Sequence, residues 1–336
     1  MKNFFCILFI FLTSSIAPTA PLLSTIERGI RASIAEKYDT ALALFDSLKQ
    51  NNPQHPAGHF FFAAVLQARM TDLETQKWQD DFHKHIDQAI VLARKNIDQN
   101  DGIIPFRYYF GAGLSYKSLQ LGREKKYLPA IKLGMAAVDE LEKTMEQNPA
   151  FFDPLLGIGL YQYWRSHLTK SLTWLPFFSD QRTEGIEKII KAAENSEFSR
   201  WAALSSLAWI YMEEQQYEQA YDYAHQGYDE IPSRFFLWPM AEAAFRQEKF
   251  ALAIDQFKRI LASLQSGQEL NNHYNELVLN WKLAQAFAKI HDWPQAEKYC
   301  NLVLNLKVGE KVKERAKDEK KGARDLLKNI TAAQKK

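Results

Sequence analysis

The sequence predicts an all-α protein built as a superhelix of antiparallel helix hairpins. Gly and Pro together number only 26 of 336 residues, below the usual share of about 12 per cent, which disfavours turn-rich β architectures. Apolar residues recur at the spacing of amphipathic helices through almost the whole chain. One internal spacing between small residues also repeats several times, which is typical of helical repeat proteins.

Composition and charge narrow the class of protein. The chain is 46% hydrophobic and 24% charged, enough apolar material for a sizeable core and too little net charge for a disordered chain. Residues 307–336 carry 9 Lys and 2 Arg against 3 Glu and 2 Asp, a net charge of +6, which leaves −4 for residues 1–306. The sequence is also rich in aromatic residues, with 22 Phe, 14 Tyr and 8 Trp.

Residues 1–20 have the layout of a secretory signal peptide. Lys2 precedes the apolar run Phe4 to Leu12, and small and polar residues follow up to Ala20. The run is too short to span a bilayer. The alternative is the first helix of a cytosolic fold, but an unbroken apolar run is not amphipathic. We expect export to the periplasm or cell envelope, with the cleavage site left open.

Export would leave one cysteine, Cys300, so no internal disulfide can hold the fold. Cys300 lies at an apolar position of a helical pattern, and we expect a buried, inert thiol.

Residues 21–150 are predicted to form helical hairpins, two of them lengthened. In the first, Gly29 is followed 12 residues later by Ala41. The next two begin near Ala63 and near Gly111 and Gly113, and their second helices lie around Ala89 and Ala137, 26 and 24 residues further on.

Residues 151–200 are predicted to form a divergent hairpin. A helix opens at Pro154 and a second covers residues 183–195, with an apolar loop between them that contains Trp174, Leu175, Phe177 and Phe178. This loop could contact a partner or a membrane, or it could fold over the protein as a plug. We favour the plug, because soluble proteins seldom expose such patches.

Residues 201–306 contain three helix-turn-helix units with one shared spacing. Each unit has a small residue in its first helix and an Ala 12 residues later in its second. Small residues at these positions let two antiparallel helices approach closely. The pairs are Ala208 and Ala220, Ala241 and Ala253, and Ala284 and Ala296.

These units resemble the tetratricopeptide repeat (TPR) family, whose pattern is Trp-x2-Leu-Gly-x2-Tyr, then Ala-x3-Phe, then Pro. The first unit reads Leu204-x2-Leu207-Ala208-x2-Tyr211, then Ala220-x3-Ala224, then Pro232. Ala244 and Cys300 stand where the family prefers aromatic residues. The resemblance implies a right-handed superhelix, an α-solenoid that serves as a protein-binding scaffold, and it extends to the hairpin that begins at Gly29.

The basic segment 307–336 has two interpretations. Its apolar residues fall near helical spacing, which predicts a final helix that packs on the last repeat and shows a charged face to water. The alternative is an arm for anionic lipid or nucleic acid, which the interspersed acidic residues disfavour. We therefore predict a capping helix and no nucleic-acid partner.

No recognisable catalytic or metal-binding pattern is present. The eight histidines include no His-Glu-x-x-His run, and the chain lacks a Gly-x-Ser-x-Gly or Walker motif. The pairs Gly111/Gly113 and Gly157/Gly159 lie in helical patterns, where glycine allows close helix packing. We therefore expect no metal, no cofactor and no enzymatic activity.

A stripe of aromatic residues gives the candidate site. Residues three before, and one and four after, each small residue share one face of the first helix of a repeat. In the TPR family this face lines the concave groove, so the resemblance implies a groove that binds a protein or peptide. The alternative is that these residues are core. The candidate groove residues are Trp209, Met212, Trp238, Glu242, Phe245, Trp281 and Gln285.

The predicted function is therefore a non-enzymatic scaffold that binds a protein or peptide partner in the cell envelope. The alternative is an α-helical hydrolase or carbohydrate-binding protein whose two carboxylates meet only in space. A third interpretation, a protein that touches a membrane surface through the apolar loop and the tail, is possible but not favoured.

Overall fold

The prediction of an all-α solenoid is confirmed by the computed structural model, which describes residues 20–97, 105–168, 179–266 and 273–334. Within these ranges the chain forms helices and contains no β-strand. The helices are α1 (Ala20–Ile34), α2 (Tyr38–Asn51), α3 (Ala57–Asp72), α4 (Gln79–Lys95), α5 (Phe106–Arg123), α6 (Tyr127–Gln147), α7 (Pro154–Leu168), α8 (Arg182–Asn195), α9 (Arg200–Glu213), α10 (Tyr217–Glu230), α11 (Arg234–Arg246), α12 (Phe250–Ser266), α13 (Tyr274–Lys289), α14 (Trp293–Asn305), α15 (Glu310–Lys313) and α16 (Lys317–Gln334).

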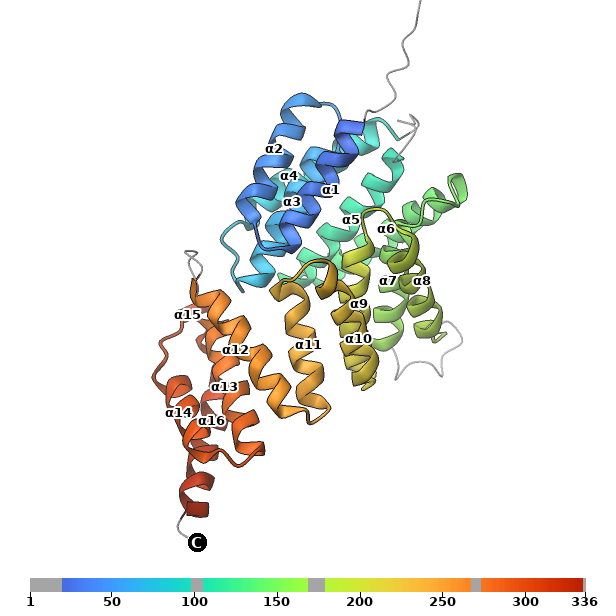
Figure 1. Cartoon of the computed structure of the whole chain (residues 1–336). Helices are drawn as coiled ribbons and strands as arrows, with labels where there is room; N and C mark the ends of the chain where they lie inside the picture. Colours follow the sequence, from blue (N-terminus) through green and yellow to red (C-terminus); the bar gives the residue numbers. More distant parts are fainter. Residues whose placement is uncertain (1–19, 98–104, 169–178, 267–272, 335–336) are drawn as a thin grey trace, which may run out of the picture.

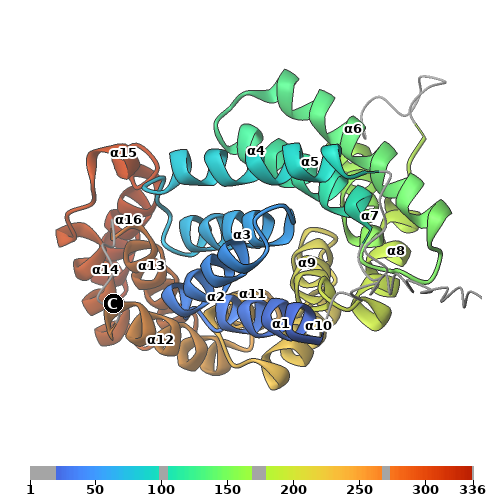
Figure 2. The same ribbon diagram turned by 90° about the horizontal axis from the view of Figure 1, so that it is seen from above.

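Consecutive helices pair into hairpins that stack into a curved array. The pairs run from α1–α2 to α13–α14, and each pair packs on the next. From α1 in the upper part of Figure 1 the chain turns through α5 to α8 and returns below α1 to α4 through α9 to α14. Seen from above, the array bends around α1 to α3 (Figure 2). Short connections make neighbouring helices antiparallel, as in other helical hairpins.

A left-handed residue closes six of the hairpin turns. In the α9–α10 turn, Gln215 has a φ of 59°, and the N–H of Gln216 donates to the carbonyl of Tyr211 at 2.8 Å. Such a bond satisfies a carbonyl that the helix end leaves free. Glycine usually fills this left-handed position. Here other residues fill it, so no glycine marks these turns in the sequence. The six left-handed residues are Glu36, Glu74, Lys125, Gln215, Glu248 and His291.

Small residues lie where paired helices touch, as the spacing predicted. The six alanines of the three C-terminal pairs are all fully buried. In α7 and α8 the approach is closer still, because a Cβ on Gly159 would lie 2.6 Å from the carbonyl oxygen of Gly185. The glycine pairs therefore serve helix packing.

The hairpin of α5 and α6 is longer than those near the C-terminus. Its helices have 18 and 21 residues, against 14 each in α9 and α10. The close contact to Ala137 is made by Gly111, whose Cβ would lie 3.2 Å from the Ala137 oxygen. Gly113, which the spacing had also paired with Ala137, instead faces Ile90 of α4.

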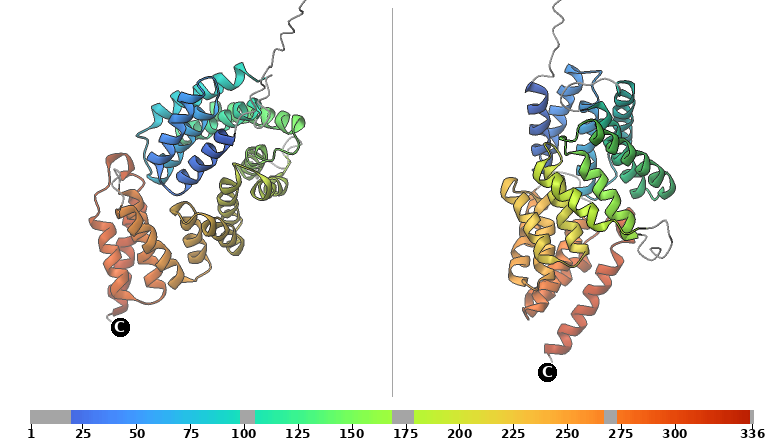
Figure 3. Two further views of the ribbon diagram at one scale, coloured as in Figure 1. Left: turned by 45° about the horizontal axis from the view of Figure 1, so that its top comes forward. Right: turned by 90° about the vertical axis from the view of Figure 1, so that its right-hand side faces the viewer.

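The basic segment ends in α16, which packs on α14 and α13 at the C-terminal end of the array (Figure 3). Val312, Ala316, Ala323 and Ile330 are buried. The Lys320 ammonium donates to the carbonyl of Leu306 at 2.8 Å, near the end of α14. The helix thus covers the last repeat and points most of its charges outward.

Two predicted features lie outside the described residues. These are the signal peptide, apart from Ala20, and the loop with Trp174, Leu175, Phe177 and Phe178. Among the residues that the structure does describe, no helix is both long and apolar enough to cross a membrane.

Candidate functional site

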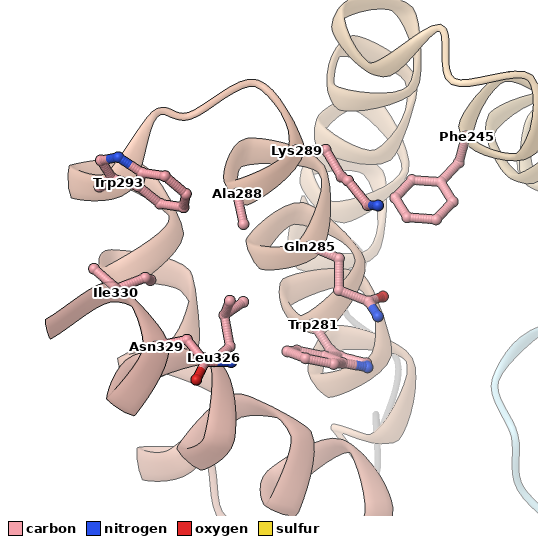
Figure 4. A pocket seen from close by; sticks show the side chains of 9 residues that line it. All are labelled: Phe245, Trp281, Gln285, Ala288, Lys289, Trp293, Leu326, Asn329 and Ile330. Carbon is pink, nitrogen blue, oxygen red and sulfur yellow. The ribbon is translucent and has the colours of Figure 1, made fainter. Parts of the chain in front are cut away.

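A pocket of about 550 Å³ opens between α11, α13, α14 and α16 (Figure 4). The second helix of the last repeat and the C-terminal helix form one side, and the first helices of two repeats form the other. Most of its surface is apolar, with amide and ammonium groups at the edge. The pocket is lined by Phe245, Trp281, Gln285, Ala288, Lys289, Trp293, Leu326, Asn329 and Ile330.

Three of the seven candidate groove residues meet at this pocket. Phe245, Trp281 and Gln285 line it, and Figure 4 shows them on the side opposite Leu326 and Asn329. The repeat positions therefore predicted three residues on one side of the pocket.

The other four candidate residues do not line this pocket. Trp209 is 43% exposed, and Met212 is half-buried. Trp238 is half-buried against the core of the C-terminal repeats. Glu242 lies next to the pocket, where it binds two cations. One continuous groove along all seven residues therefore stays a prediction.

The opposite wall was missed from the sequence. Trp293 begins α14, and Leu326, Asn329 and Ile330 lie on α16. The signal was available, because Ala323, Leu326 and Ile330 recur at helical spacing in the basic segment. The pattern predicts a capping helix. A helix that caps the last repeat also borders the concave side of that repeat, which is where the pocket lies.

Trp281 has two roles at this site. A Cβ on Gly322 of α16 would lie 2.7 Å from the indole carbon Cζ2 of Trp281, so the α16 backbone rests against the ring. The indole is half-buried and also borders the pocket. The alternative that the aromatic stripe is core therefore holds in part for Trp281.

Lys289 is the one charged residue in the lining of the pocket. Glu242 accepts from Arg246 at 3.0 Å and lies 2.6 Å from the Lys282 ammonium. The hydrogen bond from Arg246 to Glu242 raises the pKa of that guanidinium further. Lys289 is an exposed third cation. Glu242 is thus paired with two cations, of which Lys282 lies 5.1 Å from the ring centroid of Phe245, and none of the lining residues is an Asp or Glu.

A second cluster of charges lies where the two ends of the array meet. Arg234 donates to Asp72 at 2.6 Å, and the Tyr38 hydroxyl donates to the same carboxylate at 3.0 Å. Glu36 accepts from the backbone N–H of Phe235 at 3.0 Å. Burial raises the pKa of Glu36 to about 7, although Arg234 opposes the shift.

This cluster holds two carboxylates, the feature that the hydrolase alternative requires. Both carboxylates are already engaged, because Arg234 contacts both and Tyr38 and a backbone N–H supply further bonds. Their side chains are only 11 to 13% exposed. The arrangement is that of a structural ion cluster that joins two segments of the chain.

Two of the histidines contact each other between α3 and α4. The Nδ1 atoms of His59 and His85 lie 3.0 Å apart, and burial lowers the pKa of His85 to about 4. Both rings are therefore neutral near pH 7. No group of three or more His, Cys, Asp or Glu in the described part of the chain is arranged to hold a metal ion.

Cys300 is fully buried, as its position in the helical pattern predicted. Burial raises the pKa of the thiol to about 11, so the thiol is protonated at neutral pH and has little nucleophilic character.

Comparisons with known proteins support the fold. No protein-family model matches the sequence, and no curated protein matches it. The Cut9–Hcn1 hetero-tetramer of the APC/C is similar in structure with a TM-score of 0.53 and 13% identity, over 88% of this chain. This chain spans about half of that one, 48% of its length.

Two further solved structures are TPR proteins. One is from Thermus thermophilus, with a TM-score of 0.43, 15% identity, and coverage of 67% of this chain and 98% of that chain. The other is from Parabacteroides merdae, with a TM-score of 0.39, 12% identity, and coverage of 91% and 100%. Repeat spacing, hairpin packing and the similarity to the Cut9–Hcn1 structure together show that the chain has an all-α, TPR-like solenoid fold.

Proposed function

We propose that the protein is a non-enzymatic scaffold that binds a protein or peptide partner through the pocket between α11, α13, α14 and α16. The observation that carries the proposal is the meeting of Phe245, Trp281 and Gln285 at one opening. These residues were selected by repeat position alone, and that face of the first helices is where solenoid proteins present long binding surfaces.

The chemistry of the pocket favours binding. Aromatic walls supply contact area with few rotatable bonds, and a small number of amide groups can fix the register of a peptide. The side chains of Gln285 and Asn329 stand at the edge of the apolar surface. The lining holds no carboxylate, thiol, hydroxyl or imidazole, so it supplies neither the nucleophile nor the acid pair of the hydrolase alternative.

The rim suggests the charge of the partner. Lys289 is the one charged residue of the lining, and the Lys282 ammonium lies 5.1 Å from the ring centroid of Phe245, so the local field attracts acidic groups. A segment with an apolar side chain for the pocket and an acidic residue beside it would satisfy both features. The proposed partner is therefore an acidic and apolar segment of a protein.

The proposed location is the cell envelope. It is supported by the basic, apolar and small-residue regions of residues 1–20, which have the order of an export signal. The similar Cut9–Hcn1 structure is a hetero-tetramer, which supports the proposed binding of another protein.

Site-specific crosslinking in cells tests the proposal. A photoreactive residue in place of Lys289 should capture a partner, and the same residue in place of Lys298, exposed on α14, should not capture it. Ala288→Arg should fill the pocket and abolish the adduct, whereas Ala262→Arg, at an exposed site of α12, should leave it. An adduct at position 289 that survives Ala288→Arg would place the binding site elsewhere.

A further inference from the structure

An apolar stripe on α6 lies open to solvent. Tyr127 is 62% exposed, Leu128 75%, Ile131 56% and Met135 55%. Spacings of four residues place Tyr127, Ile131 and Met135 on one face of the helix, with Leu128 beside them. Soluble proteins seldom expose so many large apolar side chains on one helix without a partner for them.

The opposite face of α6 is fixed to its neighbours. Ala130 and Ala137 are buried, and the Ser118 hydroxyl of α5 donates to the Ala130 carbonyl at 2.7 Å. A Cβ on Gly134 would lie 3.7 Å from the ring of Tyr161 on α7. Figure 2 shows α6 at the outer edge of the molecule, beyond α5. The stripe therefore faces outward on a firmly seated helix.

Charge is distributed unevenly along this helix. Arg123, Lys125 and Lys126 are exposed at its N-terminal end. Asp139, Glu142 and Glu146 are exposed in its C-terminal half. Glu142 lies seven residues after Met135, on the same face as the stripe. Lys132 and Lys143 are also exposed, so the outer surface of α6 is mainly basic at one end, apolar in the middle and mainly acidic at the other end.

We propose that this face of α6 is the interface between two copies of the chain, with their α6 helices packed antiparallel about a two-fold axis. A register that sets Ile131 of one copy against Met135 of the other also sets Leu128 against Val138. The same register brings Lys125 within one turn of Glu142 of the second copy. Such a pattern is self-complementary, as a two-fold interface requires.

Other binding partners for this face of α6 fit its charges less well. A parallel pair would place Lys125 beside Lys125 and Glu142 beside Glu142, which costs free energy. An anionic bilayer would attract the N-terminal cations but would meet Glu142 on the contact face. A uniformly acidic protein would be repelled at the same end. The antiparallel second copy satisfies both ends of the helix.

Sedimentation equilibrium of the purified full chain tests the interface. The chain should dimerise within about 1 to 100 µM, and Ile131→Asp should weaken the dimer at least roughly tenfold. Val91→Asp is the matched control, since Val91 is 59% exposed on α4, and it should dimerise like the natural chain. A chain that stays monomeric throughout this range, or a dimer that tolerates Ile131→Asp, would refute the interface.

A charge swap tests the antiparallel register. Lys125→Glu and Glu142→Lys should each weaken the dimer several-fold, and the double variant should recover the natural affinity. Position 125 tolerates Glu, because Glu36, Glu74 and Glu248 hold the same left-handed site in other turns. Failure of the double variant to recover would overturn the register. Binding of monomer to phosphatidylglycerol vesicles, lost in Ile131→Asp, would overturn the dimer in favour of a lipid surface.

Discussion

Arg234 and Asp72 join the two ends of the solenoid through a paired contact. The guanidinium donates from Nη2 to Oδ2 at 2.6 Å and from Nε to Oδ1 at 3.2 Å, although 162 residues separate the two in sequence. Asn275 also donates to the Asp72 carbonyl at 2.6 Å. Repeat arrays depend mainly on contacts between neighbours, whereas this contact joins repeats that lie far apart in the sequence.

Replacing Arg234 should destabilise the protein. Arg234→Met leaves Glu36 and Asp72 in a nearly closed site without their cation, and breaking a buried ion pair on one side costs about 3 to 5 kcal/mol. Residual exposure of the cluster places the expected loss at the lower end, about 3 kcal/mol. Urea unfolding measures it, and small-angle scattering should show a larger radius of gyration as the ends separate.

The matched control is Arg259→Met. Arg259 is half exposed, lies 3.9 Å from Asp255 and donates to the Tyr228 hydroxyl at the surface, so this change should cost about 1 kcal/mol or less. Equal effects of the two substitutions, or an unchanged radius of gyration in Arg234→Met, would show that the contact does not hold the ends together.

Glu36 should make the stability depend on pH. Burial raises its pKa to about 7 in the folded protein from an ordinary value of 4.5, so the folded state holds the proton more tightly than the unfolded state. Stability from this group is therefore fully present below pH 4.5 and is lost as the pH rises through 7. Between pH 5 and 8 the expected loss is about 2 to 3 kcal/mol.

Glu36→Gln isolates this contribution, because the amide keeps the shape of the protonated acid and cannot ionise. The free energy of unfolding of the natural chain should fall relative to that of Glu36→Gln as the pH is raised from 5 to 8. A constant difference between the two chains over this range would mean that Glu36 titrates normally.

Gly159 should not tolerate a side chain, in contrast to Gly122. A Cβ at Gly159 meets the backbone oxygen of Gly185 at 2.6 Å, so Gly159→Ala should force α7 and α8 apart at a cost of about 1 to 3 kcal/mol. A Cβ at Gly122 meets nothing within 4 Å, and Gly122→Ala should stabilise by about 0.4 to 1 kcal/mol. Thermal unfolding of both variants should show shifts of opposite sign.

The sequence predicted the fold well because repeat spacing reports local packing. Ala208 and Ala220 had to be small wherever two helices cross, and their separation recurs unchanged in later repeats. The turns were harder to see, since Gln215 and Glu248 adopt left-handed conformations without glycine. Nothing local marks such residues, because the hydrogen bonds of the surrounding helices impose the conformation.

Three of the nine residues that line the pocket were among the candidates from the sequence. Phe245, Trp281 and Gln285 follow from repeat position, whereas Leu326 and Asn329 come from a helix whose docking site depends on the curvature of the array. Long-range pairs such as Arg234 and Asp72 are invisible for the same reason. Each partner is an ordinary charged residue, and only the complete superhelix brings them together.

The last prediction concerns the seat of α16 on Trp281. Gly322→Val places carbon atoms where the indole lies, since a Cβ alone would approach Cζ2 to 2.7 Å. The helix should therefore move away from α13, which would remove one side of the pocket. Ala323 and Ile330, which are buried in the natural chain, should become exposed. Hydrogen exchange of backbone amides should accelerate in α13, α14 and α16 and stay unchanged in α5 to α8, because helices of a solenoid contact mainly their neighbours. Lys321→Val, at the exposed neighbouring position, supplies the control and should exchange like the natural chain. Acceleration confined to α16 would show that the last repeat keeps its structure without the capping helix. The side of the pocket formed by α11 and α13 would then not depend on α16.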